Sequence, residues 1–318
     1  MNSEAAIPVT LDSIRAAAGR IQGRVRHTPM IAAKPLRAPL AVDLTLKLEL
    51  LQVSGSFKAR GATNKLLTLP ATELAGGLIT ASGGNHGLGV AYAAWQAKVP
   101  ATIYLPRNTP PAKAEKLRLW GAEVIMHGEV WDDANAAAQA EASRSGRAYV
   151  HPFADPAVIE GQGTVALEIL ADMPDVDVLL VAIGGGGLIA GIATAAKALK
   201  PGLQVIGIEP YGAPTLHDSL AAGRLVKLDR IETKANTLAP RQSAEINLAL
   251  IRRHVDRIVL VSDEEMLAAA RLLWFELGLA CELSAAAAVA AVLTGRYSAA
   301  RGARLCALVC GAGTDGLQ

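Results

Sequence analysis

One lysine and its neighbours have the composition of a covalent catalytic site. The segment from Ser54 to Ala62 reads S-G-S-F-K-A-R-G-A and places Lys58 after a predicted strand, at the start of a predicted helix. The positive end of a helix dipole lowers the pKa of a lysine and favours its neutral amine. A neutral amine is the nucleophile that Schiff-base chemistry requires. Taken alone, however, this segment is typical of an ordinary surface lysine.

A second segment, Ser82-Gly83-Gly84-Asn85-His86-Gly87, also lies between a predicted strand and a predicted helix. Backbone N–H groups in such a turn bind anions, and the Ser and Asn side chains add directed hydrogen bonds. The carboxylate of a small substrate is a natural occupant. A plain glycine turn with an Asn cap is an equal alternative for this segment by itself.

A third segment is rich in glycine and follows the apolar run Val178–Ile183. Its residues are Gly184, Gly185, Gly186, Gly187 and Leu188. Glycines let the backbone approach a phosphate closely, and the dipole of the following helix adds to the attraction. The segment also satisfies G-x-G-x-x-A up to Ala190, with Glu209 at the end of the next strand, which resembles a dinucleotide fingerprint. On this segment alone, a nicotinamide-dependent oxidoreductase is a serious rival interpretation.

The elements that position these segments alternate between strand-like and helix-like runs. Predicted strands cover Leu44–Leu50, Gly77–Ala81, Ala101–Leu105, Glu123–Met126, Val178–Ile183, Gln204–Ile208, Arg257–Val261 and Ala303–Val309. Predicted helices cover His86–Lys98, Ala112–Trp120, Trp131–Ser145, Val158–Met173, Leu188–Leu199 and a stretch that follows a Ser262/Glu265 capping box. The pattern predicts an α/β fold with mostly parallel sheets flanked by helices. Ligands of such sheets bind at the carboxyl ends of the strands.

The composition excludes several other classes of protein. The chain has 318 residues, of which 51% are hydrophobic and 19% are charged, so it can form a sizeable core. The net charge of +2 comes from scattered basic residues, which argues against a nucleic-acid partner. The uncharged stretch 178–196 is long enough for a membrane span, but its four successive glycines favour a strand, a loop and a helix.

The three cysteines, Cys281, Cys306 and Cys310, form no CxxC pair and do not indicate a disulfide framework. They favour a reducing compartment, and the first residues lack the apolar region of a secretory signal. We therefore expect a cytoplasmic protein.

The first two segments in combination resemble the fold-type II pyridoxal 5′-phosphate (PLP) enzymes. The pairing of S-G-S-F-K-x-R-G-A with S-x-G-N-H is similar to the serine/threonine dehydratase and serine racemase group, over about Val25 to Gly311. Sulfur-assimilating relatives instead carry S-V-K-D-R and T-S-G-N-T-G, which are absent here. The resemblance implies a tryptophan synthase β-like fold, with a large domain of residues 1–50 and 147–318 and a smaller domain of residues 51–146.

The resemblance also implies a role for each matching residue. Lys58 would form the Schiff base with PLP and move the substrate α-proton, and Phe57 would pack beside the pyridine ring. Asn85 would contact the cofactor 3′-oxygen, and Cys310 would face the pyridine nitrogen. The segment Gly184–Leu188 would hold the phosphate, and the substrate carboxylate would be bound by Ser82, Gly84, Asn85 and His86.

The implied reaction is α,β-elimination of water from a β-hydroxy amino acid, with release of ammonia and a 2-oxo acid, in a homodimer. A thiol at position 310, with an ordinary pKa of about 8.5, does not keep the pyridine nitrogen permanently protonated. This favours prompt elimination over a long-lived carbanion. An amino acid racemase, the nicotinamide-dependent oxidoreductase and a ligand-binding relative without catalysis are the alternatives, and the intact Lys58 argues against the last of these.

The chain departs from the family pattern at several positions. Racemases of this group have a serine where this chain has Gly83, which favours elimination over racemisation. The metal site of some relatives needs a Glu and an Asp, but here only Glu209 is present and Thr215 stands at the other position, so we predict no metal and keep Glu209 as a weak candidate. Departures at 235–240, 282–286 and 311–313 surround one pocket, and they indicate a substrate bulkier than serine or threonine, such as a β-aryl serine.

Overall fold

Two separate β-sheets contain all the strands of the described part of the chain, which comprises residues 8–35, 37, 40 and 42–317 of the computed structural model. The larger sheet has the order β1 (Met30–Ala32), β2 (Asp43–Lys47), β10 (Arg304–Leu308), β7 (Val178–Ala182), β8 (Gln204–Pro210) and β9 (Arg257–Val261). The smaller sheet has the order β5 (Glu123–Met126), β4 (Ala101–Leu105), β3 (Leu78–Ala81) and β6 (Ala148–Tyr149). Only β1 runs antiparallel to its neighbour, so both sheets are mostly parallel.

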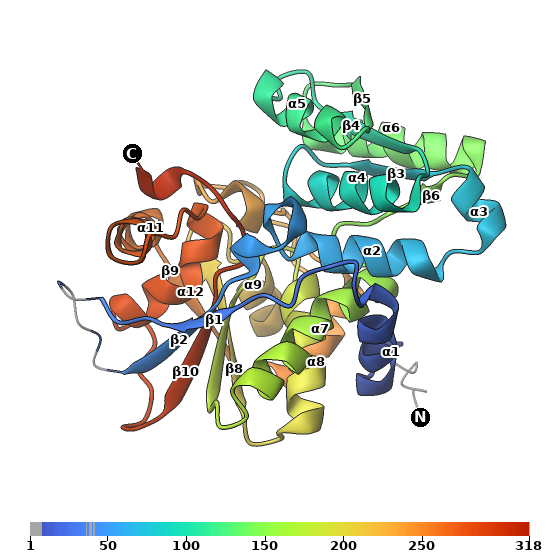
Figure 1. Cartoon of the computed structure of the whole chain (residues 1–318). Helices are drawn as coiled ribbons and strands as arrows, with labels where there is room; N and C mark the ends of the chain where they lie inside the picture. Colours follow the sequence, from blue (N-terminus) through green and yellow to red (C-terminus); the bar gives the residue numbers. More distant parts are fainter. Residues whose placement is uncertain (1–7, 36, 38–39, 41, 318) are drawn as a thin grey trace.

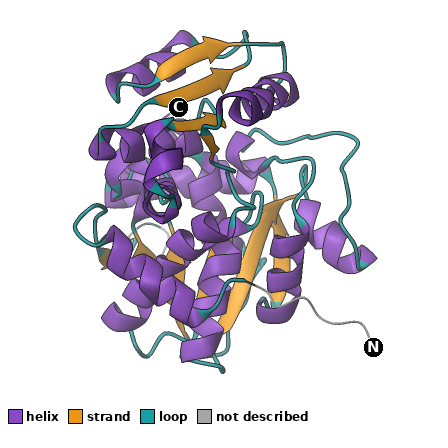
Figure 2. Cartoon of the chain, turned by 90° about the vertical axis from the view of Figure 1, so that its right-hand side faces the viewer, coloured by secondary structure: helices purple, strands orange, loops and turns teal. Residues whose placement is uncertain are grey.

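Helices cover both sheets, as parallel strands require (Figure 1). Beside the smaller sheet are α2 (Lys58–Thr68), α3 (Ala71–Ala75), α4 (Asn85–Ala97), α5 (Pro111–Leu119) and α6 (Trp131–Ser145). Around the larger sheet are α1 (Leu11–Ile21), α7 (Pro156–Asp172), α8 (Gly187–Leu199), α9 (Thr215–Ala222), α10 (Glu245–His254), α11 (Asp263–Leu277) and α12 (Leu283–Leu293). Figure 2 shows the strands enclosed between these helices.

All eight predicted strands are present, and the predicted fold class is confirmed. The first of them ends earlier than predicted, at Lys47, because the chain enters a turn of 3-10 helix at Glu49–Leu51. Strands β1 and β6 were not predicted, since runs of three and two residues give no periodic signal. The capping box at Ser262 and Glu265 opens α11 as predicted.

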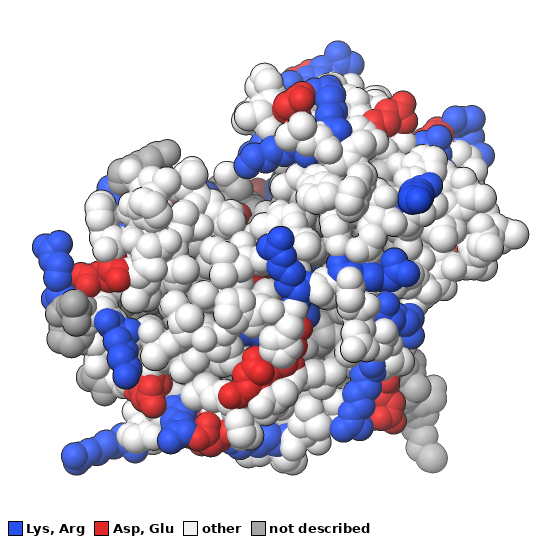
Figure 3. Space-filling view, viewed as in Figure 1, with Lys and Arg blue, Asp and Glu red and all other residues white. Residues whose placement is uncertain are grey.

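The uncharged stretch 178–196 folds as predicted into the buried strand β7, a glycine loop and the start of α8. No helix within the described residues is long and apolar enough to cross a membrane. On the face drawn in Figure 3, Lys and Arg side chains are interspersed with Asp and Glu.

Two of the three chemistry-bearing segments directly follow the carboxyl ends of parallel strands, as expected, whereas Lys58 is separated from β2 by 3-10 turns at Glu49–Leu51 and Val53–Gly55. The turn at Ser82–Gly84 follows β3, the glycine loop follows β7, and Cys310 follows β10. The four-stranded sheet spans residues 78–149, so its strand β6 lies entirely past the predicted domain boundary at 146. The exact division into two domains stays a prediction.

Candidate active site

Lys58 is the first residue of α2, and its side chain points into the protein. Its Nζ donates a 2.6 Å hydrogen bond to the carbonyl oxygen of Pro152 and lies 5.2 Å from the centre of the Phe57 ring. Burial lowers the pKa of Lys58 to about 8. The lowered pKa agrees in direction with the prediction, and its largest cause is loss of solvent. Lys58 is therefore an amine that titrates close to neutral pH.

Cys310 lies beside the lysine segment. Its carbonyl oxygen accepts a 3.2 Å hydrogen bond from the N–H of Phe57, and Ser56 pairs with Gly311 in an isolated antiparallel bridge. The side chain of Cys310 is buried, and burial raises the pKa of its thiol well above the ordinary value. The structure thus brings the neutral thiol of Cys310 to Phe57 and Lys58, although Cys310 is far from these two residues in the sequence.

The predicted carboxylate segment forms the entry to α4. The hydroxyl of Ser82 accepts a hydrogen bond from the N–H of Gly84, and α4 begins at Asn85 without a side-chain cap. The first N–H groups of such a helix have no partner inside the helix, so they remain donors for an anion.

His86 is the buried member of this segment. Its Nε2 lies 2.9 Å from the carbonyl oxygen of Val150, which can only accept, so Nε2 carries the proton. Burial, assisted by the charge of Lys58, lowers the pKa of His86 to about 3. His86 is consequently neutral at physiological pH and serves as a hydrogen-bond donor to the backbone.

The glycine loop after β7 is fixed by two polar side chains of the chain's later half. The carbonyl oxygen of Gly185 accepts hydrogen bonds from Ser243 Oγ at 2.8 Å and Asn247 Nδ2 at 2.7 Å. Gly186 has φ +94°, a conformation that favours glycine. Helix α8 starts at Gly187 with no side-chain cap, so its first turn offers free N–H donors as well as the positive end of its dipole.

The glycines of this loop have a packing reason that the sequence did not reveal. A Cβ on Gly185 would lie 2.2 Å from the ring of Phe153, and one on Gly187 would lie 2.6 Å from the Phe153 carbonyl oxygen. Likewise, a Cβ on Gly184 would lie 2.6 Å from the carbonyl oxygen of Thr237. These positions therefore cannot carry a side chain, because Phe153 and Thr237 pack directly against the loop. This holds whatever ligand the N–H groups of the loop bind.

Glu282 joins two of the predicted segments and was not predicted as a site residue. Its Oε1 accepts hydrogen bonds from Asn85 Nδ2 at 2.8 Å and from Thr237 Oγ1 at 3.3 Å. Burial raises the pKa of this carboxyl. The sequence marked the segments 235–240 and 282–286 as departures from the family pattern, although Glu282 itself matches the glutamate of that pattern, and this was the available signal. It did not show that the two residues touch Asn85 and the glycine loop.

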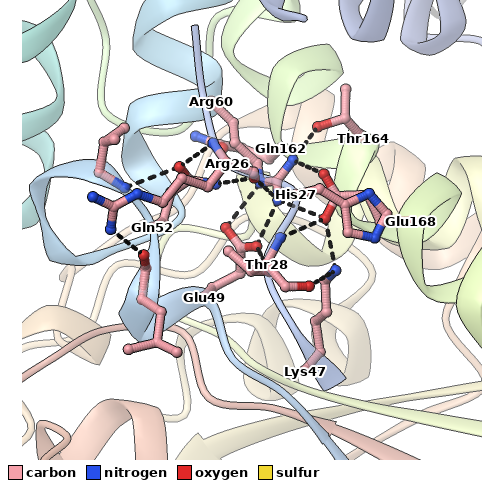
Figure 4. A network of polar contacts seen from close by, with 12 residues as sticks. Arg26, His27, Thr28, Lys47, Glu49, Gln52, Arg60, Gln162, Thr164 and Glu168 are labelled. Atoms are coloured by element: carbon pink, nitrogen blue, oxygen red, sulfur yellow. Dashed lines mark hydrogen bonds and ion pairs between the residues drawn. The ribbon is translucent and has the colours of Figure 1, made fainter. Parts of the chain in front are cut away.

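A buried ionic cluster holds the helix that carries Lys58 (Figure 4). Arg60 binds Glu49 through two hydrogen bonds of 2.8 and 2.6 Å, and Glu168 through two of 2.6 and 2.9 Å. Lys47 Nζ lies 2.6 Å from the Glu168 carboxylate. The two cations balance the two anions, and together they tie α2 to β2 and α7.

Glu209 lies at the end of β8, as predicted, and its carboxylate caps α9. Its Oε1 accepts from the N–H of Leu216 at 2.9 Å, and its Oε2 accepts from the N–H of His217 at 2.8 Å. Within the described residues, no group of three or more His, Cys, Asp or Glu side chains could hold a metal ion. Both oxygens of the weak metal candidate are thus engaged by the backbone.

Comparison with known proteins places this chain in a family. A family model described as pyridoxal-phosphate dependent enzyme matches residues 21–311. The chain belongs to this family. PLP is its cofactor, and the family match decides against the nicotinamide-dependent alternative.

The family's named relatives agree with this assignment. The chain is 41% identical to an L-threonine ammonia-lyase of Geobacter sulfurreducens over 302 residues, which cover 95% of this chain and 75% of the relative. It is 40% identical to a phenylserine dehydratase of Ralstonia pickettii over 309 residues, which cover 96% of this chain and 94% of the relative. The predicted activity class, PLP-dependent dehydration and deamination of a hydroxy amino acid, is thereby confirmed.

Solved structures confirm the fold. A maize serine racemase matches with a TM-score of 0.91 at 32% identity, covering 96% of this chain and 94% of that one. A threonine deaminase isoform 2 from Solanum lycopersicum matches with a TM-score of 0.90 at 35% identity, covering 95% and 83%. The predicted fold type II is therefore correct.

Proposed function

We propose that this protein removes water and ammonia from a β-hydroxy amino acid with a bulky β-substituent, and that Lys58 is its catalytic residue. The observation that carries the proposal is the Lys58 amine, which is buried, held at the Pro152 carbonyl and has a pKa of about 8. An amine with such a pKa is a usable nucleophile and base near neutral pH.

The donor set around Lys58 fits PLP. Lys58 would hold the aldehyde carbon, and the uncapped start of α8 would hold the phosphate. The thiol of Cys310 would face the ring nitrogen, and Asn85 would contact the 3′-oxygen. When bound, PLP supplies an electron-withdrawing ring that makes the α-proton of an attached amino acid acidic.

The protein's own side chains then bind the substrate and move the proton. The N–H groups at the start of α4, together with Ser82, bind the carboxylate, while neutral His86 keeps the turn attached to Val150. The neutral amine of Lys58 accepts the α-proton. Cys310 adds no fixed negative charge near the ring, because its thiol stays protonated at neutral pH, and this favours elimination over transamination.

Gly83 supports elimination over racemisation. A racemase needs an acid–base group on the face opposite the lysine, and glycine supplies none. A Cβ on Gly83 would lie 3.2 Å from Thr109 Cγ2 and 3.3 Å from Leu105 Cδ2, so a larger side chain would be crowded there. Position 83 therefore supplies no second group for returning the proton.

Two observations support a bulky substrate. The segments that depart from the common family pattern, 235–240 and 282–286, meet beside Asn85, because Glu282 contacts both Thr237 and Asn85. In addition, the Ralstonia phenylserine dehydratase matches over 94% of its own length, against 75% for the Geobacter threonine ammonia-lyase. We also propose a homodimer, from the family resemblance, and a cytoplasmic location, since all three cysteines are free.

The test is a substrate panel with the PLP-loaded protein. Serine, threonine and phenylserine are assayed for 2-oxo acid and ammonia, and chiral chromatography follows racemisation. We expect equimolar products, the highest kcat/KM for phenylserine and no racemisation. Preference for serine, or interconversion of its enantiomers, would overturn the substrate or the reaction proposed. Light scattering of the same sample tests the dimer.

A further inference from the structure

The contact between Asn85 and Glu282 joins the start of α4 to the residue that precedes α12. The two side chains are 197 residues apart in sequence, and Asn85 Nδ2 lies 2.8 Å from Glu282 Oε1. The carboxyl is closely enclosed, because a Cβ on Gly311 would lie 2.6 Å from the same oxygen. Glu282 thus reaches the segment that follows Cys310 as well as Asn85.

The chemistry of this contact decides how the Asn85 amide is turned. A carboxylate only accepts hydrogen bonds, so it pairs with the Nδ2 of Asn85 and not with its Oδ1. One N–H of Nδ2 is then used by Glu282, and the other remains a donor. If position 282 offered no acceptor, nothing in this contact would distinguish the two orientations of the amide.

The charges around Glu282 add a second effect. The groups that influence its carboxyl are Asn85, Thr237 and Ser284, which donate to it, and Asp315, which repels it. Glu282 in turn raises the pKa of Lys58 and the pKa of Cys310. Lys58 is the cation among these groups. A negative charge on Glu282 therefore favours the protonated form of the Lys58 amine.

We propose that Glu282 is a positioning residue of the cofactor site: its carboxylate turns Asn85 so that the free N–H faces the cofactor 3′-oxygen. The inference rests on the cofactor contacts proposed above for Asn85 and Lys58. In this inference Glu282 acts through Asn85 and not by binding the cofactor or the substrate itself.

The charge effect is tested by Glu282→Gln, which keeps the shape and an acceptor oxygen but removes the charge. The measurement is the pH at which the visible absorption band of bound PLP is half titrated. We expect this pH to fall in the variant, because a nearby negative charge favours the protonated nitrogen. Glu209→Gln is the matched control, since Glu209 is also a buried carboxyl but caps α9, and it should titrate like the unaltered protein.

The orientation effect is tested by a double-mutant cycle on PLP affinity, with Asn85→Ala, Glu282→Ala and both changes together. Circular dichroism of each cofactor-free variant establishes that it is folded. If Glu282 acts through Asn85, Glu282→Ala weakens PLP binding about tenfold or more, and adding it to Asn85→Ala has little further effect.

The outcomes separate this inference from the site assignment. Additive losses in the cycle, with an unchanged titration in Glu282→Gln, would refute the role of Glu282 alone. Wild-type PLP affinity in Asn85→Ala would instead refute the assignment of Asn85, and the inference with it.

Discussion

The amine of Lys58 donates to the carbonyl oxygen of Pro152, 94 residues later in the chain. The same stretch, which connects β6 with α7, gives the Val150 carbonyl to His86 and the Phe153 carbonyl to Asn247. One short connector therefore positions the lysine, the carboxylate segment and, through Asn247, the glycine loop. It does so with backbone atoms, so its side chains carry no signature of the role.

The first prediction concerns the pH at which Lys58 reacts. Only the neutral amine attacks an aldehyde, and the pKa of Lys58 is lowered to about 8 by burial, compared with about 10.4 for an ordinary lysine. The rate of PLP incorporation into cofactor-free protein should therefore rise with pH and level off above about 8. Stopped-flow absorbance checks this, and a rise that continues past pH 10 would show that Lys58 is not buried as described.

The second prediction concerns the glycine loop after β7. In Gly185→Ala the new Cβ would lie 2.2 Å from the Phe153 ring, so the ring or the loop has to move. We expect a loss of about 1–3 kcal/mol in the free energy of unfolding together with weaker PLP binding. Gly202→Ala is the control, because nothing lies within 4 Å of its Cβ position. Thermal unfolding and PLP titration measure both, and equal behaviour of the two variants would contradict the packing argument.

The third prediction concerns the ionic cluster below Lys58. Arg60→Met leaves the buried Glu49 without its cation, and we expect a loss of about 3–5 kcal/mol in the free energy of unfolding. Combining Arg60→Met with Glu49→Leu should recover part of this loss, since Lys47 still pairs with Glu168.

Arg144→Ala provides the comparison for this cluster. It removes an exposed pair with Glu141, which contributes at most about 1 kcal/mol. Urea unfolding tests all three variants, and a double variant less stable than Arg60→Met alone would show that the unpaired carboxylate is not the cause.

The fourth prediction concerns metal removal. Both carboxylate oxygens of Glu209 accept hydrogen bonds from backbone N–H groups of α9. We therefore expect that Glu209 does not bind a metal ion that the activity needs. Dialysis against a chelator should leave kcat and KM unchanged. A loss of activity that Mg²⁺ or Mn²⁺ restores would revive Glu209 as a ligand.

The sequence predicted the parts of the site whose residue types are specific. Lys58, the turn at Ser82–His86 and the glycine loop were found because each lies between an apolar strand and a helix, where parallel sheets bind ligands. Cys310 was assigned only by resemblance, since a buried cysteine is usually a small apolar residue. The structure places the last three of these features just beyond β3, β7 and β10, whereas Lys58 opens α2 after two 3-10 turns that follow β2.

The remaining parts depend on contacts over long sequence separations. The Pro152 carbonyl has no side-chain signature, and the Arg60 cluster combines residues from β2, the 3-10 turn at Glu49–Leu51, α2 and α7. The short strands β1 and β6 exist only because a neighbouring strand pairs with them. Local periodicity cannot predict such features, because their energy comes from tertiary partners.

The central claim, that Lys58 carries the cofactor and the chemistry, is tested most directly by reduction of the PLP-loaded protein with borohydride, followed by proteolysis and peptide mass spectrometry. The account predicts that the yellow colour is lost and that a phosphopyridoxyl group appears on Lys58 alone. A label on another lysine, or a protein that takes up PLP without any covalent label after reduction, would contradict it.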